Sequence, residues 1–184
     1  MSKIVVVFHS GYGHTKKIAE AVAQGADASL AAIDAEGNLS EADWASLAAA
    51  DGIIFGTPTY MGGPSWQFKK FADASSKVWF GQGWKDKMTA GFTNSASLNG
   101  DKFNTVQYLF TLSQQHGAVW VGAGVLPSNS KAATRDLPNS LGYSTGLLTS
   151  TPSDASVDEM VPGDLVNAHA FGQRVAAAVA RWAK

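Results

Sequence analysis

The sequence predicts an α/β fold, a doubly wound five-stranded parallel sheet with helices on both faces. Short apolar runs such as Ile4–Phe8 alternate along the chain with longer segments whose apolar residues recur at helical spacing. The runs are continuously apolar rather than alternating, which is typical of strands covered on both faces. Right-handed crossovers leave few topologies for such a chain. We detect no repeat and no change in composition, so residues 1–184 are expected to form one domain.

Each element has its own local signal. Ile4–Phe8 is rich in β-branched residues, and Ser40 with Asp43 resembles a capping box that opens an Ala-rich helix. The expected strands cover residues 4–8, 29–34, 53–56, 88–93 and 118–125. The first expected helix begins after Gly13 and ends at residue 25. The second covers 41–50, and the third begins at about residue 65 and includes residue 72. The last two cover 103–116 and 164–182. Residues 126–161 form a long Gly/Ser/Asn/Pro-rich loop, which suggests that it completes a site or an oligomer contact.

Composition excludes several classes of function. The 14 basic and 15 acidic residues give a net charge of −1, which argues against an electrostatic nucleic-acid binder. Cysteine is absent, so redox chemistry would need a borrowed cofactor, and the four scattered histidines predict no metal site. No apolar stretch approaches the roughly 20 residues of a membrane span, and the opening run is too short for a signal peptide. A soluble cytoplasmic protein is expected.

Three loops at the ends of expected strands are the candidate site: Ser10–Thr15, Pro58–Gly63 and Ser95–Gly100. Ligands of open α/β sheets bind beyond the carboxyl ends of the strands. Two glycines in the first loop let its N–H groups and the following helix dipole face a phosphate, although an ordinary turn would look similar. The second loop suits a flat ring that pairs with backbone groups, or is a plain turn before a helix. The third loop is small and polar and says little alone.

Rival motifs fit less well. The phosphate-binding G-x-x-x-x-G-K-[ST] motif is missing. A dinucleotide fingerprint would use Gly11, Gly13 and Asp34, but Lys16 stands where the third small residue should be. The G-x-S-x-G pattern at 142–146, with Asp154 or Asp158 and then His169, has hydrolase order but no apolar strand before it. His116 ends an expected helix, where a histidine is more often a C-terminal cap than a ligand contact.

Taken together, these segments resemble the flavodoxin-like superfamily, and within it the WrbA-type NAD(P)H:quinone oxidoreductases. The resemblance rests on Val5–Thr15, Gly56–Gly62, Phe92–Ser97 and Gln114–Gly117, in order along the chain. Tyr60 and Met61 depart from the family, which has Arg and Phe there. The resemblance implies the flavodoxin-like sheet order 2-1-3-4-5.

The resemblance also implies an FMN enzyme that passes two electrons from NADH or NADPH to a quinone-like acceptor, with no obligatory catalytic side chain. The implied FMN contacts are Ser10, Gly11, Tyr12, Gly13, His14, Thr15, Pro58, Thr59, Tyr60, Met61, Gly62, Ser95, Ala96, Ser97, Leu98, Asn99, Gly100 and His116. Tyr12 and Trp79 would line the nicotinamide and quinone pocket, and a homodimer or homotetramer is expected. Two alternatives remain open: a flavodoxin-type one-electron carrier, and a flavin-free relative that uses the fold for protein contacts.

Overall fold

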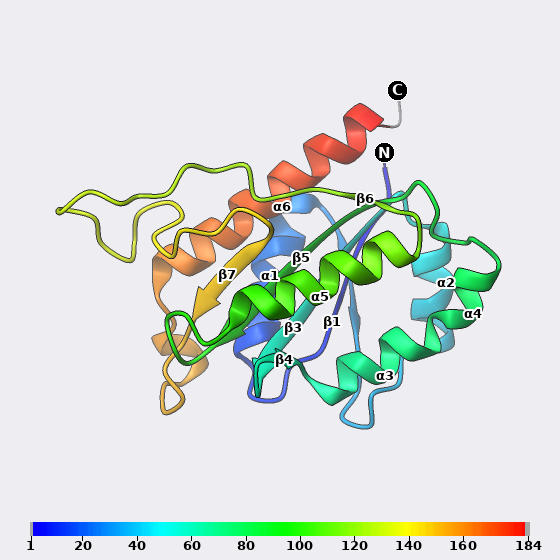
Figure 1. The fold of residues 1–184 in the computed structure, drawn as a ribbon, viewed down its shortest axis with the longest axis horizontal. Helices are drawn as coiled ribbons and strands as arrows, with labels where there is room; N and C mark the ends of the chain where they lie inside the picture. Colours follow the sequence, from blue (N-terminus) through cyan, green and yellow to red (C-terminus); the bar gives the residue numbers. More distant parts are fainter. Residues whose placement is uncertain (1, 183–184) are drawn as a thin grey trace.

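A parallel sheet with the strand order β2-β1-β3-β5-β6 forms the centre of the molecule (Figure 1). The computed structural model describes residues 2–182. The strands are β1 (Ile4–Phe8), β2 (Ser29–Ala32), β3 (Gly52–Tyr60), β4 (Gly63–Pro64), β5 (Met88–Ser95), β6 (Val119–Trp120) and β7 (Leu147–Ser150). β4 is a short antiparallel partner of β3, so the main sheet has the order that the flavodoxin-like resemblance implies.

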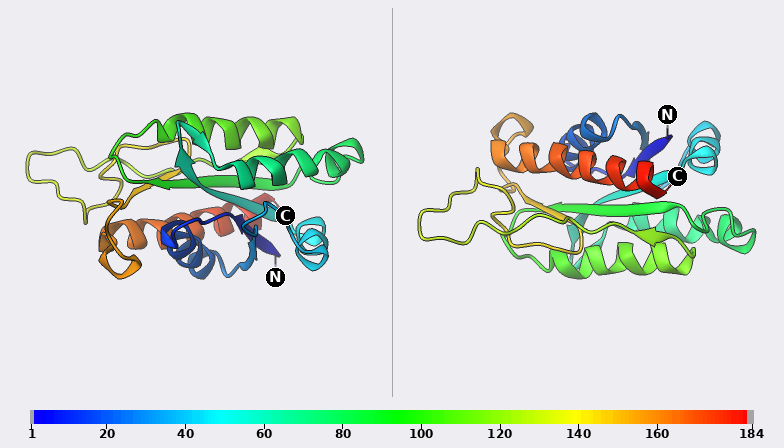
Figure 2. Two further views of the ribbon diagram at one scale, coloured as in Figure 1. Left: turned by 90° about the horizontal axis from the view of Figure 1, so that it is seen from below. Right: turned by 90° about the horizontal axis from the view of Figure 1, so that it is seen from above.

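Helices cover both faces of the sheet (Figure 2). They are α1 (His14–Ala26), α2 (Glu41–Ala49), α3 (Trp66–Ala74), α4 (Ser76–Phe80), α5 (Lys102–Gln115) and α6 (Pro162–Trp182), with one 3₁₀ turn at Val157–Glu159. α1 and α6 pack on one face, whereas α3 and α5 pack on the other. The described part of the chain has no helix long and apolar enough to cross a membrane.

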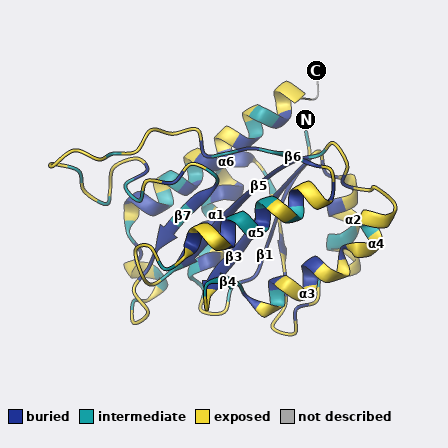
Figure 3. Ribbon diagram, in the orientation of Figure 1, coloured by how far each residue is buried: buried dark blue, intermediate teal, exposed yellow. Residues whose placement is uncertain are grey.

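The central strands are buried on both sides, as their unbroken apolar sequences predict (Figure 3). Val6 and Ile54 face the cluster formed with α1 and α6. Val5, Ile53 and Phe55 face the cluster formed with the helices of the opposite face. This alternation fixes the register of each strand, because a slip by one residue would exchange the two faces.

The edge strand differs from the sequence prediction. Residues 118–125 were expected to form one strand, but only Val119–Trp120 pair with the start of β5. The chain leaves the sheet near Gly122 and Gly124, the second of which has φ +63°. Leu147–Ser150, within the expected loop, then returns to pair with the end of β5. The residues between β6 and β7 therefore form an insertion that splits one edge strand in two, and most of it is exposed (Figure 3).

Candidate functional site

A cavity of about 320 Å³ lies at the carboxyl ends of the central strands. β2 and β3 pair with opposite sides of β1, so the loops after β1 and β3 turn to opposite faces of the sheet and leave a crevice there. The cavity is lined by Tyr12, His14, Thr15, Pro58, Thr59, Tyr60, Asn94, Ser95, Ala96, Thr151 and Ser153. The structure thus brings part of all three predicted loops together.

The first loop turns tightly from β1 into α1. Gly13, at the N-cap of α1, has φ +91°, which favours glycine. The Ser10 hydroxyl oxygen accepts hydrogen bonds from the backbone N–H groups of Gly13 and Lys16, both at 3.1 Å. Within residues 2–182, no hydrogen bond is formed by the backbone N–H groups of Gly11, Tyr12, His14 and Thr15. These unpaired donors stand at the positive end of the α1 dipole, an arrangement that suits an anion.

The segment after β7 packs over this first loop. The His14 ring Nε2 donates to the carbonyl oxygen of Ala155 at 2.8 Å, because a carbonyl oxygen can only accept. A Cβ atom placed on Gly13 would lie 2.9 Å from the Val157 Cγ1, so a side chain there would disturb the contact. The segment after β7 therefore helps to shape the first loop.

Two tyrosines stand at the cavity. Tyr12 is largely exposed, and its ring meets the Tyr60 ring edge-on with centroids 6.3 Å apart. The Tyr60 hydroxyl oxygen lies so close to Gly11 that a Cβ atom there would be 2.7 Å from it. Burial, and secondarily the nearby Tyr12, raise the pKa of the Tyr60 phenol, which keeps it protonated at neutral pH. The Tyr60 side chain thus spans the first and second loops.

The second loop is a tight hairpin rather than a plain turn before a helix. β3 continues to Tyr60, and Met61 and Gly62 turn the chain into β4 with φ +48° and +78°. Met61 is fully exposed and does not line the cavity. The buried Thr59 hydroxyl contacts the hydroxyls of Thr93 and Thr105, both at 2.8 Å. These bonds fix the segment that forms one wall of the cavity.

The third loop contributes only its beginning. Ser95 and Ala96 line the cavity, whereas Ser97, Leu98, Asn99 and Gly100 do not. The hydroxyl oxygen of Ser95 is buried and has no hydrogen-bond partner within the described residues. Buried polar groups nearly always have a partner, so this hydroxyl has an unused bond at the wall of the cavity.

Three lining residues were missed by the sequence analysis: Asn94, Thr151 and Ser153. The Asn94 side-chain oxygen accepts from the hydroxyls of Thr149 and Thr151 at 2.9 and 3.1 Å. Thr151 and Ser153 follow β7, so recognising 147–150 as a strand would have placed them at the same sheet edge. The apolar pair Leu147–Leu148, followed by Thr149, was the available signal. The G-x-S-x-G pattern precedes this strand, opposite to the order that a hydrolase needs.

His116 and Trp79 do not reach this cavity. His116 caps the C-terminal end of α5, and β6 begins three residues later. His116 therefore lies near the amino ends of the parallel strands, whereas the cavity lies at their carboxyl ends. Its Nε2 bonds to the Ser75 hydroxyl at 2.9 Å, its ring packs 4.4 Å from Trp84, and burial lowers the pKa of its imidazole. Trp79 and His116 both line a separate cavity at the amino ends of the strands. The expectation that both residues contact a ligand stays a prediction, but neither residue lines the first cavity of its own chain. The physical reason is that α4 precedes β5 and α5 ends just before β6, so both residues lie near the amino ends of these strands.

The described residues contain no cluster of three or more side chains suited to a metal ion. The donors at the cavity are backbone N–H groups, hydroxyls and one amide, which suit a phosphate and a polar heterocycle. The glycine turn at 11–13, the unpaired N–H groups and the Ser95 hydroxyl together fit a phosphorylated ring ligand.

Comparisons with known proteins agree with this geometry. Residues 5–125 match a family model described as a flavodoxin domain. The chain is 53% identical over 176 residues to "Flavodoxin FldP" of Pseudomonas aeruginosa, covering 96% of each chain. It is 55% identical to a crystal structure described as the flavodoxin, WrbA-like protein from Agrobacterium tumefaciens, with a TM-score of 0.83 and coverage of 98% and 99%.

A more distant relative has an enzyme name. The chain is 32% identical over 146 residues to "NAD(P)H dehydrogenase (quinone)" of Trichlorobacter lovleyi, covering 66% of this chain and 72% of that relative. The relatives named as flavodoxins are thus more similar to this chain than the relative named as a quinone dehydrogenase. The sheet order, the site at its switch point and the match over most of the sequence agree, and the chain belongs to the flavodoxin family.

Proposed function

We propose that the chain binds FMN in this cavity and acts as a flavodoxin-type electron carrier. The observation that carries the proposal is the set of unpaired backbone N–H groups at the start of α1, which opens at the cavity of a flavodoxin-family sheet. Bound FMN would supply the electron-accepting ring. The protein would bind, orient and partly cover it.

The donors divide between the two ends of the ligand. The N–H groups of residues 11–15, with Ser10 shaping the turn, would hold the phosphate. Pro58, Thr59 and Tyr60 on one side, and Ser95 and Ala96 on the other, would hold the ring. The free Ser95 hydroxyl would gain the bond that it lacks. Met61 and Ser97–Gly100 stand outside the cavity and have at most peripheral contacts.

The geometry favours the carrier over the reductase that the resemblance first implied. A volume of about 320 Å³ is near the lower end of the range of small-molecule sites, about 300–1,000 Å³. Such a cavity suits one ligand better than a flavin with a nicotinamide stacked on it. Of the two expected substrate contacts, Tyr12 is at the cavity but Trp79 is at the other end of the strands. A carrier needs neither a second pocket nor Trp79. The 53% identity to a protein named flavodoxin supports the same choice.

The second candidate is a reductase of NADH or NADPH and a quinone-like acceptor, and it requires a homo-oligomer. Trp79 and His116 lie together at the other end of the strands, so they could approach a flavin only in a neighbouring copy of the chain. The relatives named NAD(P)H dehydrogenase (quinone) support this candidate at 27–33% identity.

One assay separates the two. The FMN-loaded protein is mixed with NADH or NADPH and a soluble quinone, and nicotinamide oxidation is followed at 340 nm. In parallel, a ferredoxin–NADP⁺ reductase supplies electrons and cytochrome c accepts them. A carrier accelerates cytochrome c reduction and leaves the nicotinamide alone when the reductase is omitted. Rapid oxidation without the added reductase, lost in a Trp79→Ala variant, would establish the second candidate. Failure to bind FMN would refute both.

A further inference from the structure

A buried lysine begins the helix that follows the third loop. Lys102 is completely buried and is the first residue of α5. A positive charge is unfavourable near a helix N-terminus, and burial removes its hydration. Asp101 before it has φ +56° and makes no side-chain cap bond. The start of α5 therefore combines a costly charge with an unusual backbone conformation.

The ammonium group of Lys102 folds back onto the loop. Its Nζ donates to the carbonyl oxygens of Ser97 and of Leu98, the latter at 3.2 Å. The backbone N–H of Lys102 donates to the Asn99 carbonyl at 3.2 Å. The two preceding carbonyls are bonded from the other side, Ser95 by the N–H of Thr151 at 3.2 Å and Ala96 by the hydroxyl of Ser150 at 3.0 Å. Five successive carbonyls, at residues 95–99, thus have partners in the protein.

This arrangement turns the opposite groups of the loop outward. The described chain has no cis peptide bond, and in a trans peptide the N–H points away from the carbonyl of the same peptide plane. The N–H groups of residues 96 and 97 are therefore directed away from Ser150 and Thr151, and those of residues 98–100 are directed away from Lys102. Residues 96–99 are exposed, and none of their N–H groups has a partner within residues 2–182. These free donors follow Ser95 in the sequence, and of their residues only Ala96 lines the cavity.

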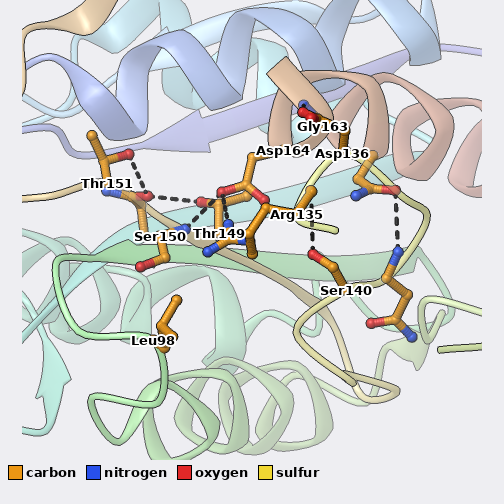
Figure 4. Close-up of polar contacts among 12 residues, drawn as sticks. Leu98, Arg135, Asp136, Ser140, Thr149, Ser150, Thr151, Gly163 and Asp164 are labelled. Carbon is orange, nitrogen blue, oxygen red and sulfur yellow. Dashed lines mark hydrogen bonds and ion pairs between the residues drawn. The ribbon is translucent and has the colours of Figure 1, made fainter. Parts of the chain in front are cut away.

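Two further charged residues, Arg135 and Asp164, lie near Lys102, and Figure 4 shows these two together. Arg135 of the insertion and Asp164 of α6 form an ion pair with Nη2 and Oδ2 2.6 Å apart. The same Asp164 oxygen accepts from the N–H of Ser150 at 2.9 Å (Figure 4). Burial, then the Arg135 charge, lower the pKa of Lys102 to about 8, and the Asp164 charge partly opposes them. The ammonium form is thus the major one only up to mildly alkaline pH.

We propose that Lys102 is a positioning residue for the flavin ring: by holding the carbonyls of Ser97 and Leu98 it fixes the third loop, and with it the cavity wall at Ser95 and Ala96 that would hold the ring. The proposal rests on the proposed function, because it assumes that the ligand is a flavin. It assigns to Lys102 no contact with the flavin itself.

The test compares Lys102→Met and Lys102→Arg with the wild type and with Lys131→Met, an exposed lysine of the insertion. Flavin-free protein is titrated with FMN and with riboflavin, and the quenching of flavin fluorescence gives each Kd. Lys102→Met is expected to weaken both ligands about tenfold or more, because loss of charge-assisted bonds frees the loop. Lys102→Arg is expected to restore most of the affinity, and Lys131→Met to leave it within twofold. The thermal midpoint of Lys102→Met is expected not to fall, since a buried charge has been removed.

The pH profile is the second readout, and it uses the wild type itself. Wild-type affinity is expected to fall between pH 7 and 9 as the ammonium is lost, whereas Lys102→Arg stays flat over the same range. Hydrogen exchange of residues 95–101 in the flavin-free protein is expected to be faster in Lys102→Met. Wild-type protein that binds no flavin would refute the proposed function, and exchange would still test Lys102. Unchanged exchange, or flavin binding by Lys102→Met within twofold of the wild type, would overturn the role of Lys102.

Discussion

Replacing Asp164 by alanine should destabilise the protein by separating the insertion from the sheet. Asp164 lies in the first turn of α6, where its charge is favourable, and its side chain is 3% exposed. Its carboxylate holds Arg135 of the insertion and the N–H of Ser150 in β7. The substitution leaves both of these donors without their partner.

The loss of the contacts with Arg135 and with the N–H of Ser150 determines the expected fall in the free energy of unfolding. Breaking a buried ion pair by removing one partner costs about 3–5 kcal/mol. Arg135 is 28% exposed and can regain part of its hydration, so we take the lower end, about 3 kcal/mol, for both losses together. For a chain of this length, each kcal/mol lowers the Tm by about 2–4 °C, so the expected fall is about 6–12 °C. Asp164→Asn keeps an acceptor for Ser150 and should lose about half as much.

Urea unfolding followed by circular dichroism measures the effect, with Asp158→Ala as the matched control. Asp158 is an exposed acid in the segment that leads to α6, so its loss should change the unfolding free energy by less than about 0.5 kcal/mol. A double-mutant cycle with Arg135→Met isolates the ion pair. An Asp164→Ala protein within 0.5 kcal/mol of the wild type would show that the insertion is held without this pair.

Three other perturbations follow from single observations. Ser10→Ala removes the acceptor of two N–H groups in the first loop and should weaken FMN about tenfold in a fluorescence titration, while riboflavin, which lacks the phosphate, binds as before. Gly56→Ala would place a Cβ atom into the Phe92 ring, and thermal melting should show a loss of about 1–3 kcal/mol; a neutral result would mean that the ring has room to move. The third concerns pH. Because the pKa of Lys102 is about 8 when folded and 10.5 in its unperturbed state, the unfolded chain binds more protons between these values. The unfolding free energy should therefore rise by up to about 2 kcal/mol from pH 8 to 10, and a Lys102→Met protein that rises equally would contradict this reasoning.

The core of the fold was predictable because each central strand is short, apolar and followed by a loop of small residues. Ile4–Phe8 can be buried only between two layers of helices, and that requirement determines the class of fold. The interrupted edge strand was less predictable. Ala118–Val125 reads as a continuous strand, and only the positive φ of Gly124 shows where the chain departs. The local sequence does not indicate that residues 147–150 pair with the end of β5, while β6 pairs only with its start.

The first loop of the site was predictable for a different reason. Gly13 needs a left-handed backbone and Ser10 a local acceptor role, and both are properties of a few neighbouring residues. A ligand contact by His116 was not predictable in this way, because it depends on where the C-terminal end of α5 lies and on which copy of the chain holds the ligand. The spacing of residues in a motif does not determine tertiary placement of this kind. Asn94 was missed because its bonds to Thr149 and Thr151 depend on the pairing of β7 with β5.

The buried charge of Lys102 is better explained by the loop conformation that it holds than by a contribution to stability. Lys102 is buried at the wrong end of a helix dipole, and its lowered pKa indicates that the folded state disfavours its charge. An apolar residue of similar size would stabilise the fold more, but it would leave the carbonyls of Ser97 and Leu98 free to turn outward. Asp164 acts at the other side of the same loop, because Ser150, which it holds, also bonds the carbonyl of Ala96. Asp164 thus joins Arg135 of the insertion to Ser150 of β7, and Ser150 in turn bonds the loop beside the cavity.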